Sequence, residues 1–245
     1  MQPAAATPDQ LLELYDRLLR AYGPQSWWPA MSRLEVMVGA ILVQNTAWEN
    51  VVRAVGNLRR ADLLDARRLH ALPVDRLETL IKPAGPYRVK AARLRNLLSL
   101  IVDEYGGDID RLLSLDTPTL RERLLAVSGV GKETADSILL YAAERPTFVV
   151  DAYTHRLLTR HGWLDPRTPA AKRYDAMQAV FEAGLPREVG LYNELHALIV
   201  EVGKRHCRSR PRCEGCPLAP MLPDGGPIDP AEPKAEGRPR TRRRG

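Results

Sequence analysis

Apolar residues recur at every third or fourth position along most of the chain, which is the spacing of an amphipathic α-helix. Leu, Val and Ile supply most of these positions, and Gly or Pro residues stand in the gaps. The segments with this spacing are 8–23, 33–43, 48–64, 90–106 and 119–127. The β-branched run at 147–153 is too short to support a sheet. The pattern therefore predicts an all-α fold with helices of about 10 to 17 residues.

The helical pattern stops near the C-terminus. Prolines recur every few residues from Pro217 onward, so we expect the folded part to end near Leu222. The segment 234–245 carries six positive charges and one negative charge, a net charge of +5, whereas the whole chain carries +6. The remainder therefore carries about +1, and the net charge indicates a polyanion partner only weakly. The tail is either a solvated end or a nonspecific nucleic-acid arm.

A chain of 245 residues with 44% hydrophobic residues can bury a sizeable core, as one domain or as two smaller lobes. No apolar run approaches the roughly 18 residues that a membrane span needs. The first ten residues lack the basic and apolar segments of a secretory signal. We therefore expect a cytoplasmic protein, associated with the nucleoid if its source is bacterial, and no membrane partner.

The stretch SGVGKETADSILLYA interrupts the helical pattern with Gly129 and Gly131 on either side of Val130. Glycine permits backbone conformations that other residues rarely adopt, and it leaves backbone amides uncovered. A helix is expected to begin at about Lys132, and the unpaired N–H groups of its first turn favour a phosphate oxygen. The pattern therefore predicts a helix-hairpin-helix that holds a nucleic-acid backbone without reading its sequence. An ordinary turn between helices explains the same residues.

Asp151 follows the apolar run TFVV and opens another expected helix, so its ordinary role is that of an N-cap. Helix N–H groups stabilise the ionised form of such a carboxylate. An ionised carboxylate also suits glycosidic cleavage, because the transition state of that reaction resembles an oxocarbenium ion. Removal of a base from DNA is a reaction of this kind.

Together, SGVGKETADSILLYA and FVVDAYTHR resemble the helix-hairpin-helix and the catalytic aspartate of the endonuclease III superfamily of DNA glycosylases. Two further stretches, AILVQNT and IKPAGPYRVKAARL, agree with this family in order and spacing, and the similarity covers roughly residues 30–222. The resemblance implies two α-helical lobes with double-stranded DNA in the cleft between them. We expect the enzyme to be a monomer.

By the same resemblance, residues 32–147 form a six-helix barrel that carries the hairpin. Residues 148–222 form a second helical lobe with a cysteine-cluster loop, and an N-terminal helix within residues 1–31 packs on this lobe. Residues 223–245 are expected to be a disordered basic tail.

In family members that also cleave the DNA strand, a lysine stands second after Gly-Val-Gly and attacks the sugar. Glu133 occupies that position here, and Lys132 stands one residue earlier, about 100° away around a helix. Nothing near Lys132 in the sequence favours the neutral amine that a nucleophile needs. We therefore predict that Asp151 activates water and that Lys132 contacts a phosphate. Glu133 either binds the extruded base, assists its protonation, or only complements the helix dipole.

Three of the four tryptophans, Trp27, Trp28 and Trp48, lie within the first fifty residues. Clustered tryptophans are most often packing residues. An alkylated purine carries positive charge, however, and its extruded ring stacks well on an indole. WWP before the first barrel helix, an aromatic residue after QNT and Glu133 resemble the 3-methyladenine glycosylases of the superfamily, which implies that these tryptophans line a base pocket.

A base that leaves the duplex creates a gap. The resemblance implies that Gln44 fills this gap, and that Pro86 in AGPYR wedges between bases of the opposite strand. That wedge position usually holds a bulkier apolar residue, but proline is among the apolar wedges that proteins use. Alternatively, the segment at Pro86 is a tight turn, and Gln44 is a polar residue at a helix end.

The three cysteines lie in HCRSRPRCEGCPLAPML, at Cys207, Cys213 and Cys216. Such a concentration favours a metal site over disulfides. The family pattern C-x6-C-x2-C-x5-C holds a [4Fe-4S] cluster, but here the first gap is one residue shorter and Leu222 replaces the fourth cysteine. The resemblance therefore implies a [4Fe-4S] cluster with three Cys ligands and a fourth ligand from Asp224, His206 or water. A three-iron cluster, zinc held by the cysteines and His206, or no metal are the alternatives.

The sequence thus predicts a base-excision-repair glycosylase that hydrolyses the N-glycosidic bond of damaged bases, with alkylated bases as the expected substrates, without strand cleavage. An endonuclease III-like enzyme on oxidised pyrimidines, with weak lyase activity through Lys132, is the alternative within the family. A noncatalytic DNA-lesion binder is the alternative outside enzymology.

Overall fold

The computed structural model describes residues 5–165 and 167–228. Every regular element within these residues is helical, which confirms the predicted all-α class. None of the described helices combines the length and apolarity that a membrane crossing requires. Residues 229–245, which include most of the predicted basic tail, lie outside the described residues.

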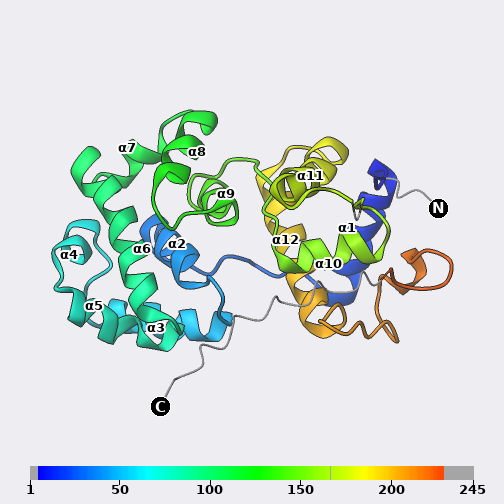
Figure 1. Ribbon diagram of the computed structural model, residues 1–245, viewed down its shortest axis with the longest axis horizontal. Helices are drawn as coiled ribbons and strands as arrows, with labels where there is room; N and C mark the ends of the chain where they lie inside the picture. The colour runs from blue at the N-terminus through cyan, green and yellow to red at the C-terminus, as the bar shows by residue number, and fades with distance from the viewer. Residues whose placement is uncertain (1–4, 166, 229–245) are drawn as a thin grey trace, which may run out of the picture.

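The first lobe contains eight α-helices, which share one core (Figure 1). They are α2 (Arg33–Leu42), α3 (Trp48–Arg60), α4 (Ala66–Ala71), α5 (Val74–Ile81), α6 (Tyr87–Ser99), α7 (Ile109–Leu113), α8 (Thr117–Ala126) and α9 (Lys132–Tyr141). Every residue of α2 after Arg33 is buried, because α3, α6 and α9 all pack against this helix. The short turn η1 (Lys82–Ala84) follows α5, and the π-helical turn η2 (Leu100–Glu104) follows α6.

Several helices differ in length from the sequence prediction. Helices α4, α5 and α7 have 6, 8 and 5 residues, below the predicted range. They are held by the tertiary core rather than by their own length, since each contributes buried leucines to it, such as Leu69, Leu77 and Leu112. The single helix predicted over 90–106 is divided into α6 and the π turn η2.

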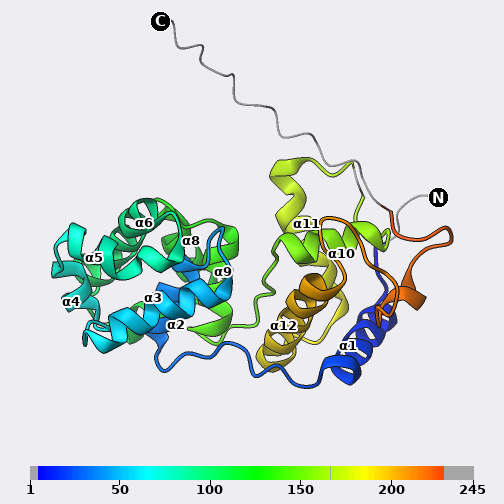
Figure 2. The same ribbon diagram turned by 90° about the horizontal axis from the view of Figure 1, so that it is seen from below.

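The second lobe joins the two ends of the chain (Figure 2). It contains α1 (Pro8–Tyr22), α10 (Ala152–Arg160), α11 (Ala170–Gly184), α12 (Val189–Arg205) and the short turn η3 (Ala219–Met221). Helix α1 packs on α12 and α11, and it buries Leu11, Leu14 and Leu18 in a second core. The described chain continues past the predicted boundary at Leu222 to Ile228, whose N–H donates to the carbonyl of Arg160 at 3.0 Å.

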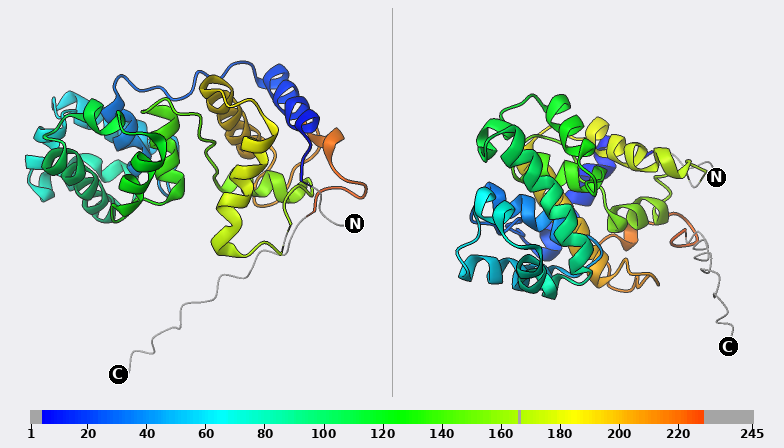
Figure 3. Two further views of the ribbon diagram at one scale, coloured as in Figure 1. Left: turned by 90° about the horizontal axis from the view of Figure 1, so that it is seen from above. Right: turned by 60° about the vertical axis from the view of Figure 1, so that its left-hand side comes forward.

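Two segments connect the lobes, one between α1 and α2 and one between α9 and α10 (Figures 2 and 3). The second segment contains the β-branched run of the sequence, which forms no strand. Phe148 stacks on Phe181 with ring centroids 4.0 Å apart, and Val149 and Val150 are buried beside it. The run is therefore apolar because it enters the second core, and it delivers Asp151 to the start of α10.

A buried carboxylate also connects the lobes. Asp136 of α9 is fully buried, and its oxygens accept hydrogen bonds from Arg121 of α8 at 2.7 and 3.1 Å. The same carboxylate accepts from Tyr174 Oη at 2.8 Å and from Gln178 Nε2 at 2.9 Å, and both of these residues lie on α11. These contacts fix the orientation of α9, the hairpin helix, against the second lobe.

Candidate active site

Asp151 is the N-cap of α10, as its place in the sequence suggests. Its Oδ1 accepts from the backbone N–H of Thr154 at 2.8 Å and from the Thr154 hydroxyl at 2.9 Å. Its Oδ2 lies 3.8 Å from Nε2 of His196 on α12. One carboxylate oxygen therefore holds the helix start, and the other faces the boundary between the lobes.

Glu133 stands in the first turn of α9, directly after the hairpin. Its side chain keeps contact with solvent, but partial burial of the carboxyl group, and secondly the Asp151 carboxylate, raise its pKa to about 7. The Asp151 carboxylate, at the N-terminus of α10, therefore influences a residue of the hairpin helix. Glu133 is thus both a proton donor and a proton acceptor near neutral pH, whereas a first-turn acid that only complements the helix dipole stays ionised.

Two residues of this site, the buried His196 and the partly buried Tyr141, carry no motif in the sequence. Tyr141 at the end of α9 hydrogen-bonds Nδ1 of His196, and both side chains lie between the lobes. Burial raises the pKa of Tyr141 well above its usual range, with a further rise from Asp151, and the Trp27 side chain opposes it. Burial lowers the pKa of His196, and Asp151 opposes this shift. The only sequence signal was a histidine inside the apolar stretch LHALIV, which is also the pattern of a satisfied core histidine.

The three tryptophans predicted to form a base pocket do cluster. Ring centroids lie 5.7 Å apart for Trp27 and Trp28, 5.2 Å for Trp27 and Trp48, and 4.7 Å for Trp28 and Trp48. Trp28 lies 5.1 Å from the ring of Tyr141, which extends the aromatic cluster toward Asp151. A methyl group at Gly39 would stand 3.0 Å from the Trp28 ring, so this glycine allows the indole to lie against α2. Trp28 and Trp48 also line a pocket of about 500 Å³.

The hairpin turn has the backbone that its glycines suggest. Gly129 has a φ of +95°, and a Cβ there would stand 2.2 Å from Cγ of Arg93. Val130 is 6% exposed, and its N–H donates to the carbonyl of Val127 at 3.0 Å. Gly131 is the N-cap of α9 with open space beside it and no side-chain cap. The amino end of α9 is therefore accessible to an anion.

Lys132 is paired within the protein. Its Nζ lies 2.7 Å from both carboxylate oxygens of Asp175 on α11, and 5.9 Å from the centroid of the Tyr174 ring. Both partners of the ion pair are partly exposed, so a phosphate can compete with Asp175 for this ammonium. No sequence pattern indicates Asp175 as the partner of Lys132, because it follows the hairpin by more than forty positions.

Gln44 is also held by the hairpin rather than projecting freely. Its Nε2 donates to the carbonyl of Gly129 at 3.1 Å and to the hydroxyl of Thr134 at 2.9 Å. Its Oε1 accepts from Nη1 of Arg93 at 2.5 Å. The amide is thus fixed beside the turn that the sequence predicts to hold DNA.

Pro86 is exposed and stands at the N-cap of α6. A buried lysine lies beneath it: Nζ of Lys90 donates to the carbonyl of Leu42 at 2.8 Å and to the carbonyl of Ala84 at 2.5 Å. Leu42 ends α2 just before Gln44, and Ala84 precedes the turn at Pro86. Lys90 therefore ties together the two segments that carry the predicted gap-filling and wedge residues.

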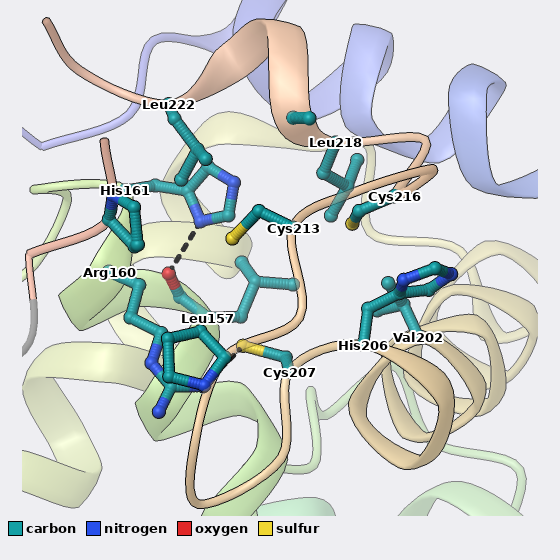
Figure 4. A pocket seen from close by; sticks show the side chains of 13 residues that line it. Leu157, Arg160, His161, Val202, His206, Cys207, Cys213, Cys216, Leu218 and Leu222 are labelled. Carbon is teal, nitrogen blue, oxygen red and sulfur yellow. Dashed lines mark hydrogen bonds between the residues drawn. The ribbon is translucent and has the colours of Figure 1, made fainter. Parts of the chain in front are cut away.

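The three cysteines line one pocket in the second lobe, remote in sequence from the hairpin (Figure 4). The pocket encloses about 350 Å³ between α10, α12 and the loop that follows α12. Arg160 is 3% exposed; its Nη1 lies 3.2 Å from Sγ of Cys207 and donates to the carbonyl of Arg208 at 2.7 Å. A buried guanidinium thus lies against one of the three sulfur atoms of the pocket.

His206 and Asp224, the two residues proposed as a fourth cluster ligand, differ in position. His206 lines the pocket, and its Nδ1 lies 3.0 Å from the carbonyl of Arg212. Asp224 is exposed and does not line the pocket, because the chain turns outward between Leu222 and Pro227. Among the residues that the structure describes, no group of three or more His, Cys, Asp and Glu side chains has a ready metal-binding geometry. Burial raises the pKa values of Cys213 and Cys216, and the neighbouring thiols add to the rise.

Residues 38–183 match the family model of the HhH-GPD superfamily base excision DNA repair proteins. The chain is 47% identical over 211 residues to a Methanocaldococcus jannaschii protein named as a DNA repair glycosylase, covering 86% of this chain and 94% of that protein. It is 32% identical to endonuclease III of Thermotoga maritima, over 74% of this chain and 78% of that enzyme.

Two solved structures show the same arrangement of helices. The 3-methyladenine DNA glycosylase MagIII of H. pylori, bound to 1,N6-ethenoadenine, superimposes with a TM-score of 0.67 at 29% identity, covering 81% of this chain and 97% of that one. A trapped covalent complex of endonuclease III with DNA gives a TM-score of 0.74 at 21% identity, covering 89% and 96%.

Proposed function

Because the chain belongs to the HhH-GPD superfamily of base excision DNA repair proteins, we propose that it hydrolyses the N-glycosidic bond of damaged bases with water as the nucleophile. The observation that carries this proposal is the pairing of Asp151 with Glu133, two carboxyl groups from different lobes that interact electrostatically. Glycosidic hydrolysis uses such a pair, with one group ionised and the other able to supply a proton.

Asp151 is the proposed electrostatic and water-orienting member of the pair. Its Oδ1 is held by Thr154, so its Oδ2 is the oxygen that stabilises the cationic sugar and orients water. Glu133, with a pKa near 7, protonates the departing base or hydrogen-bonds it. The acid form of Glu133 is lost as pH rises through about 7, so release of a neutral base falls over that range. Replacement by Gln removes this pH dependence.

We propose an alkylated purine as the substrate. Trp27, Trp28 and Trp48 supply indole faces close to Tyr141, and a purine made cationic by alkylation is attracted to such faces. The similarity to the H. pylori 3-methyladenine glycosylase, at 29% identity, is consistent with this choice.

The proposed enzyme does not cleave the strand. A lyase needs a neutral amine at the sugar, but the Lys132 ammonium contacts both oxygens of Asp175, and Glu133 occupies the second position after the hairpin. Double-stranded DNA is the proposed partner, with the open amino end of α9 on a phosphate.

The thiols of Cys207, Cys213 and Cys216 fit a [4Fe-4S] cluster with respect to donor type, because all three line one pocket beside a buried arginine. We propose that they hold this cluster, with water or His206 as the fourth ligand. A bound cluster would hold the three cysteines of the loop after α12 together, next to Arg160 of α10. The protein as isolated should then absorb near 400 nm (roughly where thiolate-to-iron charge transfer lies), and a colourless preparation with stoichiometric zinc would overturn the cluster.

A panel of labelled duplexes tests the activity. Duplexes with 3-methyladenine-type, thymine glycol or abasic lesions are incubated with the protein, and strand breaks are compared with and without hot alkali. Breaks that appear only after alkali on the alkylated duplex are expected. Breaks without alkali, or trapping of the protein on DNA by borohydride, would instead establish a lyase. Binding without base release would establish a recognition protein.

Replacement of Asp151 by Asn tests the assigned carboxylate. The amide keeps the size of the side chain and an oxygen for the helix cap, but it removes the negative charge. Base release should fall by at least about a thousandfold, and duplex affinity should be retained. Unchanged turnover would remove Asp151 from the mechanism.

A further inference from the structure

The imidazole of His196 lies at the centre of the proposed site, yet only one of its nitrogens is satisfied. The residue is 6% exposed. Nδ1 hydrogen-bonds the Tyr141 hydroxyl, whereas the buried Nε2 has no hydrogen-bond partner among the described residues. The nearest anionic atom to Nε2 is Oδ2 of Asp151, at 3.8 Å. A buried nitrogen that faces the reactive oxygen of the site requires an explanation.

The contact with Tyr141 determines which nitrogen carries the proton. Burial keeps Tyr141 in its neutral form, so its O–H can donate, and a neutral imidazole accepts through its unprotonated nitrogen. If Nδ1 accepts from Tyr141, the ring proton is on Nε2. The N–H then lies on the nitrogen nearest Oδ2 of Asp151, at 3.8 Å, slightly beyond hydrogen-bond distance.

We propose that His196 is a positioning residue for Asp151: its Nε2–H, fixed in place by Tyr141, orients Oδ2 toward the sugar and the attacking water. The inference rests on the proposed function, in which Oδ2 performs the chemistry. The Tyr141 ring packs on Trp28 of the proposed base pocket, with centroids 5.1 Å apart.

The titratable groups that face this imidazole come from two elements. Tyr141 approaches from α9, and Asp151 from the start of α10. Glu133 interacts with the same Asp151 carboxylate. If His196 were protonated, Nδ1 could no longer accept from Tyr141, and the ring would place a positive charge next to Asp151. The proposed positioning therefore requires a neutral imidazole at neutral pH.

The tautomer can be measured without any assay of activity. Long-range ¹H–¹⁵N correlation spectra of the uniformly labelled full chain distinguish a protonated Nε2 from a protonated Nδ1. The expected spectrum of His196 shows protonation at Nε2 alone, and the Tyr141→Phe variant should show a mixture of tautomers. Protonation at Nδ1, or at both nitrogens, at neutral pH would overturn the inference.

Two substitutions separate the roles of the two nitrogens. In His196→Gln the side-chain amide reaches the position of Nε2 and can still donate to Asp151. In His196→Asn the amide reaches only the position of Nδ1 and contacts Tyr141 alone. We expect His196→Gln to retain kcat within about threefold and His196→Asn to lose about 10- to 100-fold in kcat with little change in KM. Equal losses of kcat in both variants would show that His196 only packs in the site and does not position Asp151.

The matched control is His70→Gln, since His70 is a half-buried histidine that contacts Ser99 in the first lobe, away from Asp151. It should leave kcat unchanged. The wild-type protein distinguishes the two hypotheses: if it releases no base from any duplex of the panel, the proposed function fails. If it releases bases and His196→Asn turns over at the wild-type rate, only the positioning role fails.

Discussion

At the scale of single residues, the chemistry of the site depends on neighbours that are distant in sequence. By sequence, Glu133 is an ordinary first-turn acid of α9. In the folded protein the Asp151 charge at the start of α10 contributes to the rise of its pKa. Burial gives the larger part of the rise in its pKa, and the Asp151 charge adds to it. By sequence both residues are helix-start acids, and only the fold lets the Asp151 charge act on Glu133.

The contribution of Asp151 to Glu133 is measurable. In Asp151→Asn the negative charge is lost, so the ionised form of Glu133 is less disfavoured and its pKa falls below about 7. It stays above the usual value of 4.5, because the burial contribution persists. Carboxyl ¹³C chemical shifts of labelled Glu, followed against pH, give this value. Asp116→Asn is the control, since Asp116 also caps a helix but does not act on Glu133, and an equal shift there would contradict the interaction.

The two glycines of the hairpin also differ at the residue scale. Ala at position 129 must adopt a positive φ and meets Cγ of Arg93 at 2.2 Å, whereas Ala at position 131 has an extended backbone and open space. Gly129→Ala should lower the free energy of unfolding by about 1–3 kcal/mol, and Gly131→Ala by less than about 1 kcal/mol. Urea denaturation of both variants tests the difference, and equal losses would show that the turn is not strained as described.

At the scale of elements, Lys90 fastens the end of α2 to the turn before α6. Its side chain is almost fully buried, and burial, together with the charge of Arg93, lowers its pKa from 10.5 to about 8. Two helix-end carbonyls receive its hydrogen bonds, and a neutral amine can still donate them. The ammonium is thus tolerated at neutral pH, but the site prefers the neutral form.

This preference predicts how stability depends on pH. Between pH of about 8 and 10.5 the unfolded chain binds the Lys90 proton and the folded chain does not, so this residue makes the folded state more stable as pH rises. Lys90→Met should be less stable by about 1–3 kcal/mol, because two carbonyls lose their donor. The free energy of unfolding of the variant should also lack the increase with pH that Lys90 contributes. Urea unfolding at pH 7.5, 8.5 and 9.5 checks both statements, and parallel curves for the two proteins would refute the second.

At the scale of the whole molecule, the site exists only while the lobes keep one orientation. Asp136 contributes most visibly, because its buried carboxylate joins Arg121 of the first lobe to Tyr174 and Gln178 of the second. Lys132 and Asp175 make a second, more exposed contact between the same two helices, α9 and α11. Breaking the buried contact should therefore affect both stability and the position of Asp151 relative to the hairpin.

Asp136→Ala tests this contact. It leaves Arg121, Tyr174 and Gln178 without their shared acceptor, so we expect a loss of about 3 kcal/mol in the free energy of unfolding. Asp110→Ala removes a mostly exposed partner of Arg33 and should cost less than about 1 kcal/mol. Chemical denaturation measures both, and a loss below about 1 kcal/mol in Asp136→Ala would show that the network does not hold the lobes.

Much of the architecture could be read from the sequence, and the reason is local. Helix periodicity, the glycines at 129 and 131 and the cap at Asp151 depend on neighbours within a few positions. The short helices α4, α5 and α7 were missed because their stability comes from the shared core. Within the site, the contact between His196 and Tyr141 could not be predicted from the sequence, because the two residues are 55 positions apart.

The sequence by itself determined the helical class, the hairpin turn, the position of Asp151 at a helix start and the grouping of the three cysteines. These features depend on spacing along the chain, and spacing is fixed before folding. Three features depend on the tertiary structure. The pKa of Glu133 is raised to about 7, Lys132 is paired with Asp175, and Nε2 of His196 lies 3.8 Å from Oδ2 of Asp151. Burial and charge at those atoms arise only when two lobes meet, because the dielectric environment and the distance between side chains belong to the folded packing.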